Sequence, residues 1–129
     1  MKTDDESTYP LHSETRTIIG ICMEVYNELG RGLQEIVYKD AIEYDFKQKA
    51  IPYQREKEYS IFYKGIVLPH KFSADFVVYN SVILEVKAQK NIIEDNYTQT
   101  INYLAISKCK IGLIVNFGEL SLKFKRVIF

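Results

Sequence analysis

The sequence predicts a single α/β domain, of the α+β type with a mixed sheet. Its 129 residues suit one domain, and 47% hydrophobic with 26% charged residues is an ordinary globular composition. Three segments repeat apolar residues every three or four positions, which is typical of amphipathic helices. The remaining segments alternate or run continuously in β-branched and aromatic residues, which predicts strands. Together these patterns predict the element order α-α-β-β-β-α-β-β.

The N-terminal part predicts two helices after a short lead-in. Residues 1–12 are acidic and are expected to form a flexible lead-in to a domain that spans 13–129. Ser13 is the candidate N-cap of the first helix, which should end at the turn Gly30-Arg31-Gly32. The second helix is expected at about 34–49. Its expected apolar face consists of Ile36, Val37, Ala41 and Tyr44.

The rest of the chain predicts five strands and one helix. From residue 56 the period changes to two, and Lys64-Gly65 predicts a turn. Strands are then expected at 71–79 and 82–88, a helix at 94–107, and strands at 111–116 and 122–129. The segment 111–116 is a β-rich apolar run that ends in Asn116, which is typical of a strand buried on both faces.

Charge and cysteine content narrow the functional class. The 17 basic and 17 acidic residues balance, so a nucleic-acid partner would have to be recognised by local charge placement. Cys22 and Cys109 form no C-x-x-C pair, which argues against a disulfide or zinc scaffold. No apolar run approaches the ~20 residues of a membrane helix, and no secretory signal is visible. A cytoplasmic protein without a membrane partner is therefore expected.

The segment from Asp75 to Lys87 carries the candidate chemistry. Glu85 and Lys87 share one strand face because they are two residues apart. Asp75 faces Glu85 only if residues 79–81 form a three-residue loop, since a two-residue turn would place it opposite Val86. The sequence therefore predicts an odd-length loop or a bulge. Two facing carboxylates and the Val86 carbonyl would suit Mg²⁺ or Mn²⁺, and Lys87 would stabilise charge on a phosphodiester.

The Asp-Glu-Lys spacing alone also fits a solvated strand edge. Further residues favour the interpretation as a catalytic site. Glu35 lies in the first turn of the second helix, near the positive end of the helix dipole. Gln99 and Tyr103 are one turn apart on the helix that follows the Glu85 strand. Glu24 is a rival helix acid.

Positive residues gather towards the end of the chain. They are Lys108, Lys110, Lys123, Lys125 and Arg126. With Lys87 and Lys90 they could form a phosphate-binding rim. Solvated strand and loop ends are the alternative interpretation.

The sequence resembles the GxxExxY proteins, a family placed in the PD-(D/E)XK nuclease-like superfamily. The resemblance covers about 13–129. Its main motifs are Gly32-x-x-Glu35-x-x-Tyr38, Ala74-Asp75, Glu85-Val86-Lys87-Ala88, Gln99-x-x-x-Tyr103 and Asn116-Phe117-Gly118. It implies a restriction-endonuclease-like αβββαβ core with an extra N-terminal helix. Ala74 stands where the superfamily's name has proline.

The resemblance implies a metal-dependent nuclease that hydrolyses phosphodiester bonds, with DNA favoured over RNA. The implied catalytic residues are Glu35, Asp75, Glu85 and Lys87. The implied ligands of Mg²⁺ or Mn²⁺ are Asp75, Glu85 and the Val86 backbone carbonyl, with Glu35 as a further candidate. The implied supporting or substrate-binding residues are Gln99, Tyr103, Tyr38 and Lys90. A catalytically silent nucleic-acid-binding or protein-interaction module stays open, as does a homodimer or a larger processing complex.

Overall fold

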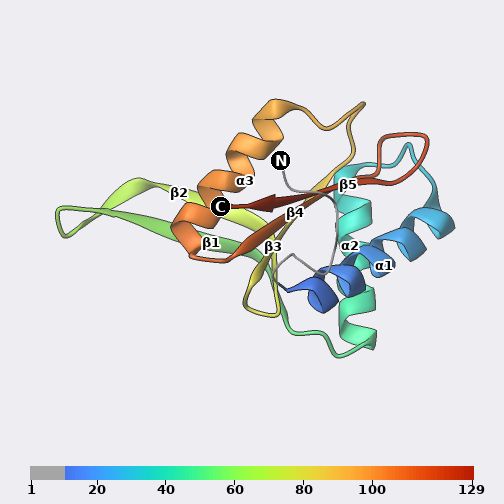
Figure 1. The fold of residues 1–129 in the computed structure, drawn as a ribbon, viewed down its shortest axis with the longest axis horizontal. Helices are drawn as coiled ribbons and strands as arrows, with labels where there is room; N and C mark the ends of the chain where they lie inside the picture. The colour runs from blue at the N-terminus through green and yellow to red at the C-terminus, as the bar shows by residue number, and fades with distance from the viewer. Residues whose placement is uncertain (1–10) are drawn as a thin grey trace.

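Helices and strands follow one another in the predicted order. The structure, a computed structural model, describes residues 11–129 (Figure 1). Its elements are α1 (His12–Leu29), α2 (Glu35–Gln48), β1 (Tyr53–Tyr63), β2 (Ile66–Val78), β3 (Val82–Lys87), α3 (Glu94–Ser107), β4 (Ile111–Asn116) and β5 (Lys123–Ile128). The predicted single α+β domain with a mixed sheet is therefore confirmed.

The five strands form one sheet in the order β1-β2-β3-β4-β5. Only β3 and β4 pair in parallel in this sheet, within the described residues 11–129. The α3 helix makes the crossover connection that a parallel pair requires. All six residues of β4 are buried, as the apolar run predicted.

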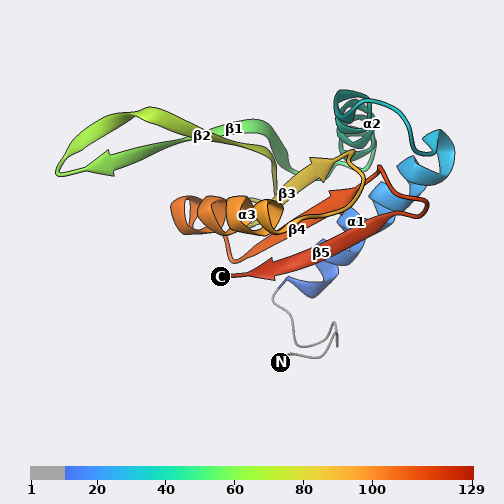
Figure 2. The same cartoon turned by 90° about the horizontal axis from the view of Figure 1, so that it is seen from above.

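The helices cover the sheet from both sides (Figure 2). Val82, Leu84 and Val86 of β3 belong to the core cluster that contains the buried faces of α1 and α2. Ile83 points to the other side of the sheet and belongs to the second core cluster. The α3 residues of that cluster include Tyr103. The alternation of β3 therefore divides the protein into three layers.

Two sequence expectations about the helices are wrong. Helix α1 begins at His12 after Leu11, with no side-chain cap, so Ser13 lies inside the helix. On α2, Ile36, Val37 and Tyr44 are exposed, whereas the buried residues are Tyr38, Lys39, Ile42 and Phe46. The spacing of four from Tyr38 to Ile42 to Phe46 defines the face that packs on the sheet. Hydrophobicity alone selected the wrong face because two of the four buried residues carry polar groups.

The first two strands are longer than predicted. They begin at Tyr53 and Ile66, whereas the sequence predicted starts at residues 56 and 71. The predicted turn at Lys64-Gly65 is confirmed, with φ of 49° and 79°. The outer parts of β1 and β2 project beyond the other strands as a two-stranded ribbon (Figure 2). Phe62, near its tip, is 69% exposed.

The connection between β2 and β3 has the predicted odd length. Val78 pairs with Val82, so residues 79–81 form a three-residue loop, in which Tyr79 and Asn80 both have positive φ. The predicted lead-in 1–12 falls largely on residues 1–10, which lie outside the described residues. No helix in the described range is long and apolar enough to cross a membrane.

Candidate active site

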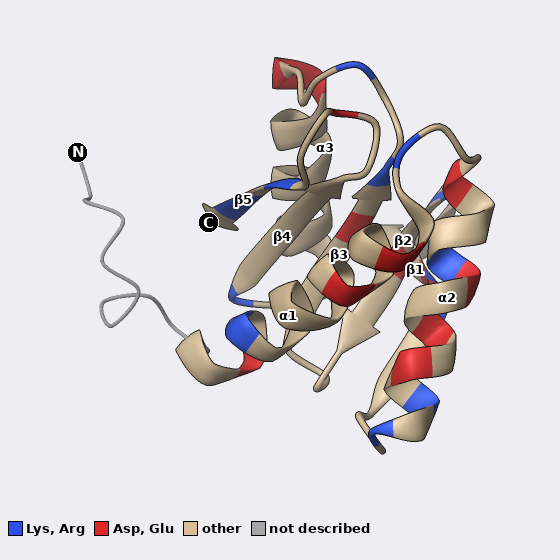
Figure 3. Ribbon diagram, turned by 90° about the vertical axis from the view of Figure 1, so that its right-hand side faces the viewer, with Lys and Arg blue, Asp and Glu red and all other residues tan. Residues whose placement is uncertain are grey.

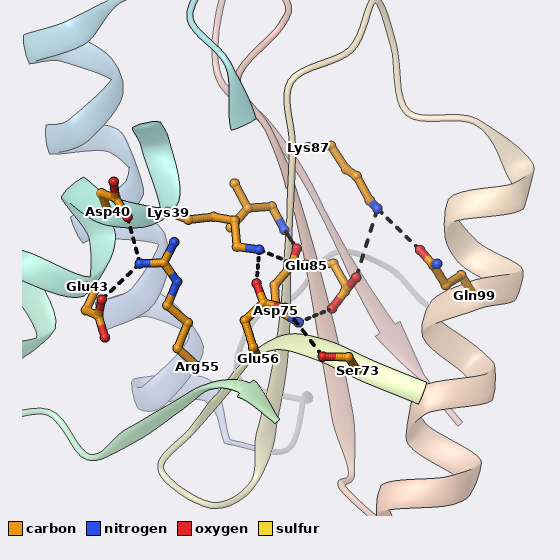
Figure 4. A network of polar contacts seen from close by, with 11 residues as sticks. Lys39, Asp40, Glu43, Arg55, Glu56, Ser73, Asp75, Glu85, Lys87 and Gln99 are labelled. Atoms are coloured by element: carbon orange, nitrogen blue, oxygen red, sulfur yellow. Dashed lines mark hydrogen bonds and ion pairs between the residues drawn. The ribbon is translucent and has the colours of Figure 1, made fainter. Parts of the chain in front are cut away.

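Three acidic residues form a row across β1, β2 and β3. Asp75 lies opposite Glu85, because the neighbouring residues pair as Phe76 with Leu84. Glu56 lies opposite Asp75, because Arg55 pairs with Phe76 and Lys57 with Ala74 on either side of them. Directly opposed residues point to the same side of a sheet, so the three carboxyl groups converge (Figure 4).

The two inner carboxyl groups are held by each other's strands. The Asp75 backbone N–H donates to Glu85 Oε2 at 2.9 Å, and the Val86 N–H donates to Asp75 Oδ2 at 2.8 Å. Side-chain oxygens thus occupy positions that carbonyl oxygens fill elsewhere in the sheet. Only 2% of Glu85 and 9% of Asp75 is exposed. The pair is buried and tightly positioned.

A lysine from α2 enters this cluster. Lys39 Nζ donates to Asp75 Oδ1 at 3.0 Å and also to Glu56 Oε1 (Figure 4). Burial by itself would lower the pKa of Lys39, but its hydrogen bonds to Glu56 and Asp75 raise it instead. Lys39 is therefore a buried, charged partner of Asp75. Neither Lys39 nor Glu56 was expected from the sequence, although Lys39 follows Glu35 by one helical turn and so shares its face.

The opposite side of the cluster is formed by β3 and α3. Lys87 Nζ lies 4.0 Å from Glu85 Oε1 and donates to Gln99 Oε1 at 3.3 Å (Figure 4). Tyr103 lies one turn further along α3 and is 6% exposed. Burial, followed by the charges of Glu85 and Asp75, raises the pKa of Tyr103 to about 12. Its hydroxyl therefore keeps its proton at neutral pH.

Burial and mutual repulsion of the carboxyl groups destabilise the fully ionised form of the cluster. Burial and the neighbouring Asp75 raise the pKa of Glu85 to about 8. Burial and Asp75 also raise the pKa of Glu35, which interacts electrostatically with the cluster. In the described part of the chain this group contains four carboxyl groups and two ammonium groups: Glu35, Glu56, Asp75 and Glu85, with Lys39 and Lys87. Clustered carboxylates favour either a proton or a bound cation.

The carboxylate oxygens of Asp75 and Glu85 match the type and the number of protein ligands that Mg²⁺ commonly uses. Asp75 and Glu85 offer hard oxygens, and Mg²⁺ commonly uses one or two carboxylates while it retains several waters. Within residues 11–129, no group of three or more His, Cys, Asp or Glu side chains is arranged to hold a metal ion. Any such ion would therefore depend on the Asp75–Glu85 pair and on water.

Tyr38 stabilises the loop that precedes α2. It is fully buried, its hydroxyl donates to the Gly30 carbonyl at 2.6 Å, and that hydroxyl accepts from the Leu33 N–H at 3.2 Å. Its ring stacks on Phe117 with centroids 4.3 Å apart. These contacts fix the turn from which α2 begins and so fix the position of Glu35 in its first turn.

Not every candidate residue joins the cluster. The structure brings together Glu35, Asp75, Glu85, Lys87, Gln99 and Tyr103. Lys90 is exposed on the β3–α3 loop, outside this group. Glu24 is exposed on α1 and pairs with Lys49 at 3.7 Å, so it is not the helix acid of this site. Val86 contributes its N–H to Asp75, and the ligand role of its carbonyl stays a prediction.

Comparison with known proteins gave a family match and matches to solved structures. A family model described as PD-(D/E)XK nuclease superfamily matches residues 12–127. A solved structure described as the crystal structure of SSO0001 superposes with a TM-score of 0.57 at 17% identity. That match covers 71% of this chain and 48% of the other, so it spans about half of SSO0001. At this identity the likeness shows the fold alone. No curated protein matches the sequence.

Proposed function

The chain belongs to the PD-(D/E)XK nuclease superfamily, and on that premise we propose that it is a metal-dependent nuclease acting on DNA in preference to RNA. The observation that carries this proposal is the buried Asp75–Glu85 pair with Lys87 beside it. Nucleases of this superfamily generally use divalent metal ions such as Mg²⁺. The seven-residue motif that ends at Tyr38 further supports the GxxExxY family within it.

Asp75 and Glu85 would hold Mg²⁺ or Mn²⁺, with the Val86 carbonyl as a further ligand and Glu35 as an additional candidate. A divalent ion in this position supplies Lewis acidity and lowers the pKa of a bound water. The residues themselves provide the burial and the negative charge that attract such an ion. Asp75 and Glu85 need no reorganisation to face one another, because backbone N–H groups already orient them.

Lys87 would stabilise the negative charge that develops on the phosphodiester. Its side chain is 16% exposed, and its ammonium group lies between Glu85 and Gln99, so it has access from solvent yet a defined position. Gln99 orients this ammonium group through its side-chain oxygen. Tyr103 offers a hydroxyl that stays protonated and can donate to a phosphate oxygen. A preorganised donor at a site of developing charge contributes about 10²–10³ in rate.

A catalytically silent nucleic-acid-binding or protein-interaction module is the second candidate. Lys39 favours it, because a buried ammonium group already neutralises Asp75 at 3.0 Å. In this alternative the lysine takes the electrostatic place of a metal ion. The two candidates differ in one measurable property, which is turnover.

The test is cleavage of labelled single- and double-stranded DNA and RNA by the purified protein, with Mg²⁺, Mn²⁺ or EDTA. Glu85→Gln keeps the side-chain shape and removes its charge, while Glu28→Gln makes the same change at an exposed position of α1. We expect cleavage that needs the metal, survives Glu28→Gln, and falls at least about 10²-fold in Glu85→Gln. Cleavage that is absent from the wild type, or equal in both variants, contradicts the nuclease proposal.

Location and assembly complete the proposal. We place the protein in the cytoplasm, and its two free cysteines, Cys22 and Cys109, are in keeping with a reducing compartment. A homodimer or a larger nucleic-acid-processing complex is the proposed setting. Sedimentation equilibrium over a range of concentrations tests self-association directly.

A further inference from the structure

Three loops meet beside the candidate active site and form a basic surface. Two adjoining hollows, with volumes of about 460 and 410 Å³, share Arg31, Lys90 and Gly118 in their linings. Lys123 lines the second of them, and Gly32 lines the first. We call this surface the basic hollow. Arg31 comes from the α1–α2 connection, Lys90 from the β3–α3 connection, and Lys123 is the first residue of β5.

The cations of the basic hollow are available to a ligand. Arg31, Lys90 and Lys123 are all exposed. Among residues 11–129, none of the three forms an ion pair with an acidic side chain. Figure 3 shows Lys and Arg positions on the loops at this end of the sheet. The one acidic residue in the lining, Glu119, is turned to Asn116, whose Nδ2 donates to Glu119 Oε2 at 2.8 Å.

The floor of the basic hollow is rigid. Asn116 is fully buried, and its Oδ1 accepts from the N–H groups of Gln89 at 3.0 Å and Gly118 at 3.1 Å. Its Nδ2 also donates to the Gln89 carbonyl at 2.9 Å. A Cβ on Gly118 would lie 2.1 Å from the Gln89 carbonyl oxygen, so glycine permits this close approach. The loop that carries Lys90 is thus joined to the loop that leads into β5 and Lys123, whereas Tyr38 fixes the loop that carries Arg31.

The basic hollow adjoins the acidic cluster along the chain. Ala88, in its lining, directly follows Lys87, and Leu33, also in its lining, precedes Glu35 by two residues. Each separation is at most two residue lengths, or roughly 7 Å of backbone. A strand of nucleic acid with one phosphate at Lys87 would therefore bring a neighbouring phosphate to the basic hollow.

We propose that the basic hollow is a phosphate-binding subsite, in which Arg31, Lys90 and Lys123 bind the nucleic-acid backbone next to the phosphodiester at Lys87. This inference rests on the proposed function for the identity of its ligand. It explains how a chain with zero net charge can bind a polyanion, because the favourable charge is gathered at one surface. Backbone contacts of this kind determine affinity and register and carry no sequence preference.

The test compares two triple variants that remove the same charge. Arg31→Gln, Lys90→Gln and Lys123→Gln neutralise the basic hollow. Lys47→Gln, Lys49→Gln and Lys64→Gln neutralise three exposed cations elsewhere, at the end of α2 and at the turn between β1 and β2. Binding of fluorescein-labelled single- and double-stranded DNA is measured by anisotropy in EDTA between about 50 and 200 mM salt. Circular dichroism and urea midpoints confirm that all variants fold.

We expect the basic-hollow variant to bind at least about tenfold more weakly, with a salt dependence of log K reduced by about 2–3 in slope. The control variant should retain most of the affinity. An equal loss in both triple variants, or no DNA binding by the wild type, would overturn the inference. Parallel cleavage assays separate the two proposals. DNA binding that depends on the basic hollow, without any cleavage, would contradict only the nuclease proposal. Cleavage by the wild type, with unchanged DNA binding in the basic-hollow variant, would contradict only the subsite proposal.

Discussion

Replacement of Glu85 by glutamine should change how the stability of this protein depends on pH. Glu85 is 2% exposed and lies opposite Asp75, and its pKa is raised from 4.5 to about 8. In the unfolded chain the same carboxyl group ionises near pH 4.5. Between these two values the folded protein therefore holds one more proton than the unfolded chain, shared within the Asp75–Glu85 pair.

The sign and size of the effect follow from this proton difference. Because the folded state binds the extra proton, the free energy of unfolding falls as the pH rises, by about 1.4 kcal/mol per pH unit. Between about pH 5 and pH 7.5 the loss amounts to roughly 3 kcal/mol. Glu85→Gln cannot ionise, so this loss should be absent from the variant. The variant should match the wild type near pH 5 and exceed it in stability above pH 7.

The assay is urea denaturation of metal-free protein, followed by circular dichroism at several pH values. Taking the difference between wild type and variant removes the contributions of the other titrating groups. Glu28→Gln, at an exposed position of α1, serves as the matched control and should keep the wild-type pH dependence. Equal pH dependence in wild type and Glu85→Gln would refute the reasoning. Added Mg²⁺ should restore wild-type stability at pH 7.5 and leave Glu85→Gln almost unchanged.

Four further substitutions, one of them a control on α1, are each measured by urea denaturation. Tyr38→Phe removes the hydroxyl that joins two backbone groups and should cost about 1–3 kcal/mol; an unchanged midpoint would show that the loop is fixed otherwise. Gly112→Ala would place a Cβ 2.4 Å from Thr100 Cγ2 and should cost about 1–3 kcal/mol, whereas Gly20→Ala on α1 meets nothing within 4 Å and should stabilise by up to ~1 kcal/mol. Opposite outcomes for the two glycines would contradict this account. Lys39→Met leaves buried carboxyl groups without their counter-charge and should cost about 3 kcal/mol at neutral pH, with a smaller loss at acid pH. A loss that does not vary with pH would argue against the charge of Lys39 as the stabilising feature.

The order of elements was predictable because periodicity reports which face of each segment is apolar. The opposition of Asp75 and Glu85 was predictable on the condition of a three-residue loop at 79–81, because side-chain alternation then determines it. The family comparison later identified the same superfamily from residues 12–127.

Other features required the packed structure. The buried face of α2 contains Tyr38 and Lys39, whose polar groups find partners only after the chain has folded. Glu56 reaches the cluster because the register of β1 against β2 places it there, and that register depends on long-range pairing. The clustering of Lys90 and Lys123 depends in turn on how Asn116 joins the segments that carry them.

Backbone N–H groups of β2 and β3 donate to the carboxyl groups of the site, so NMR spectroscopy can report the state of those carboxyl groups. The amide protons of Asp75 and Val86 end on carboxylate oxygens, so their chemical shifts depend on the charge of those oxygens. Protonation, or the arrival of a cation, should therefore move two backbone resonances in a ¹⁵N-labelled sample. The state of the carboxyl pair could then be followed residue by residue, with no substrate present and no reaction taking place.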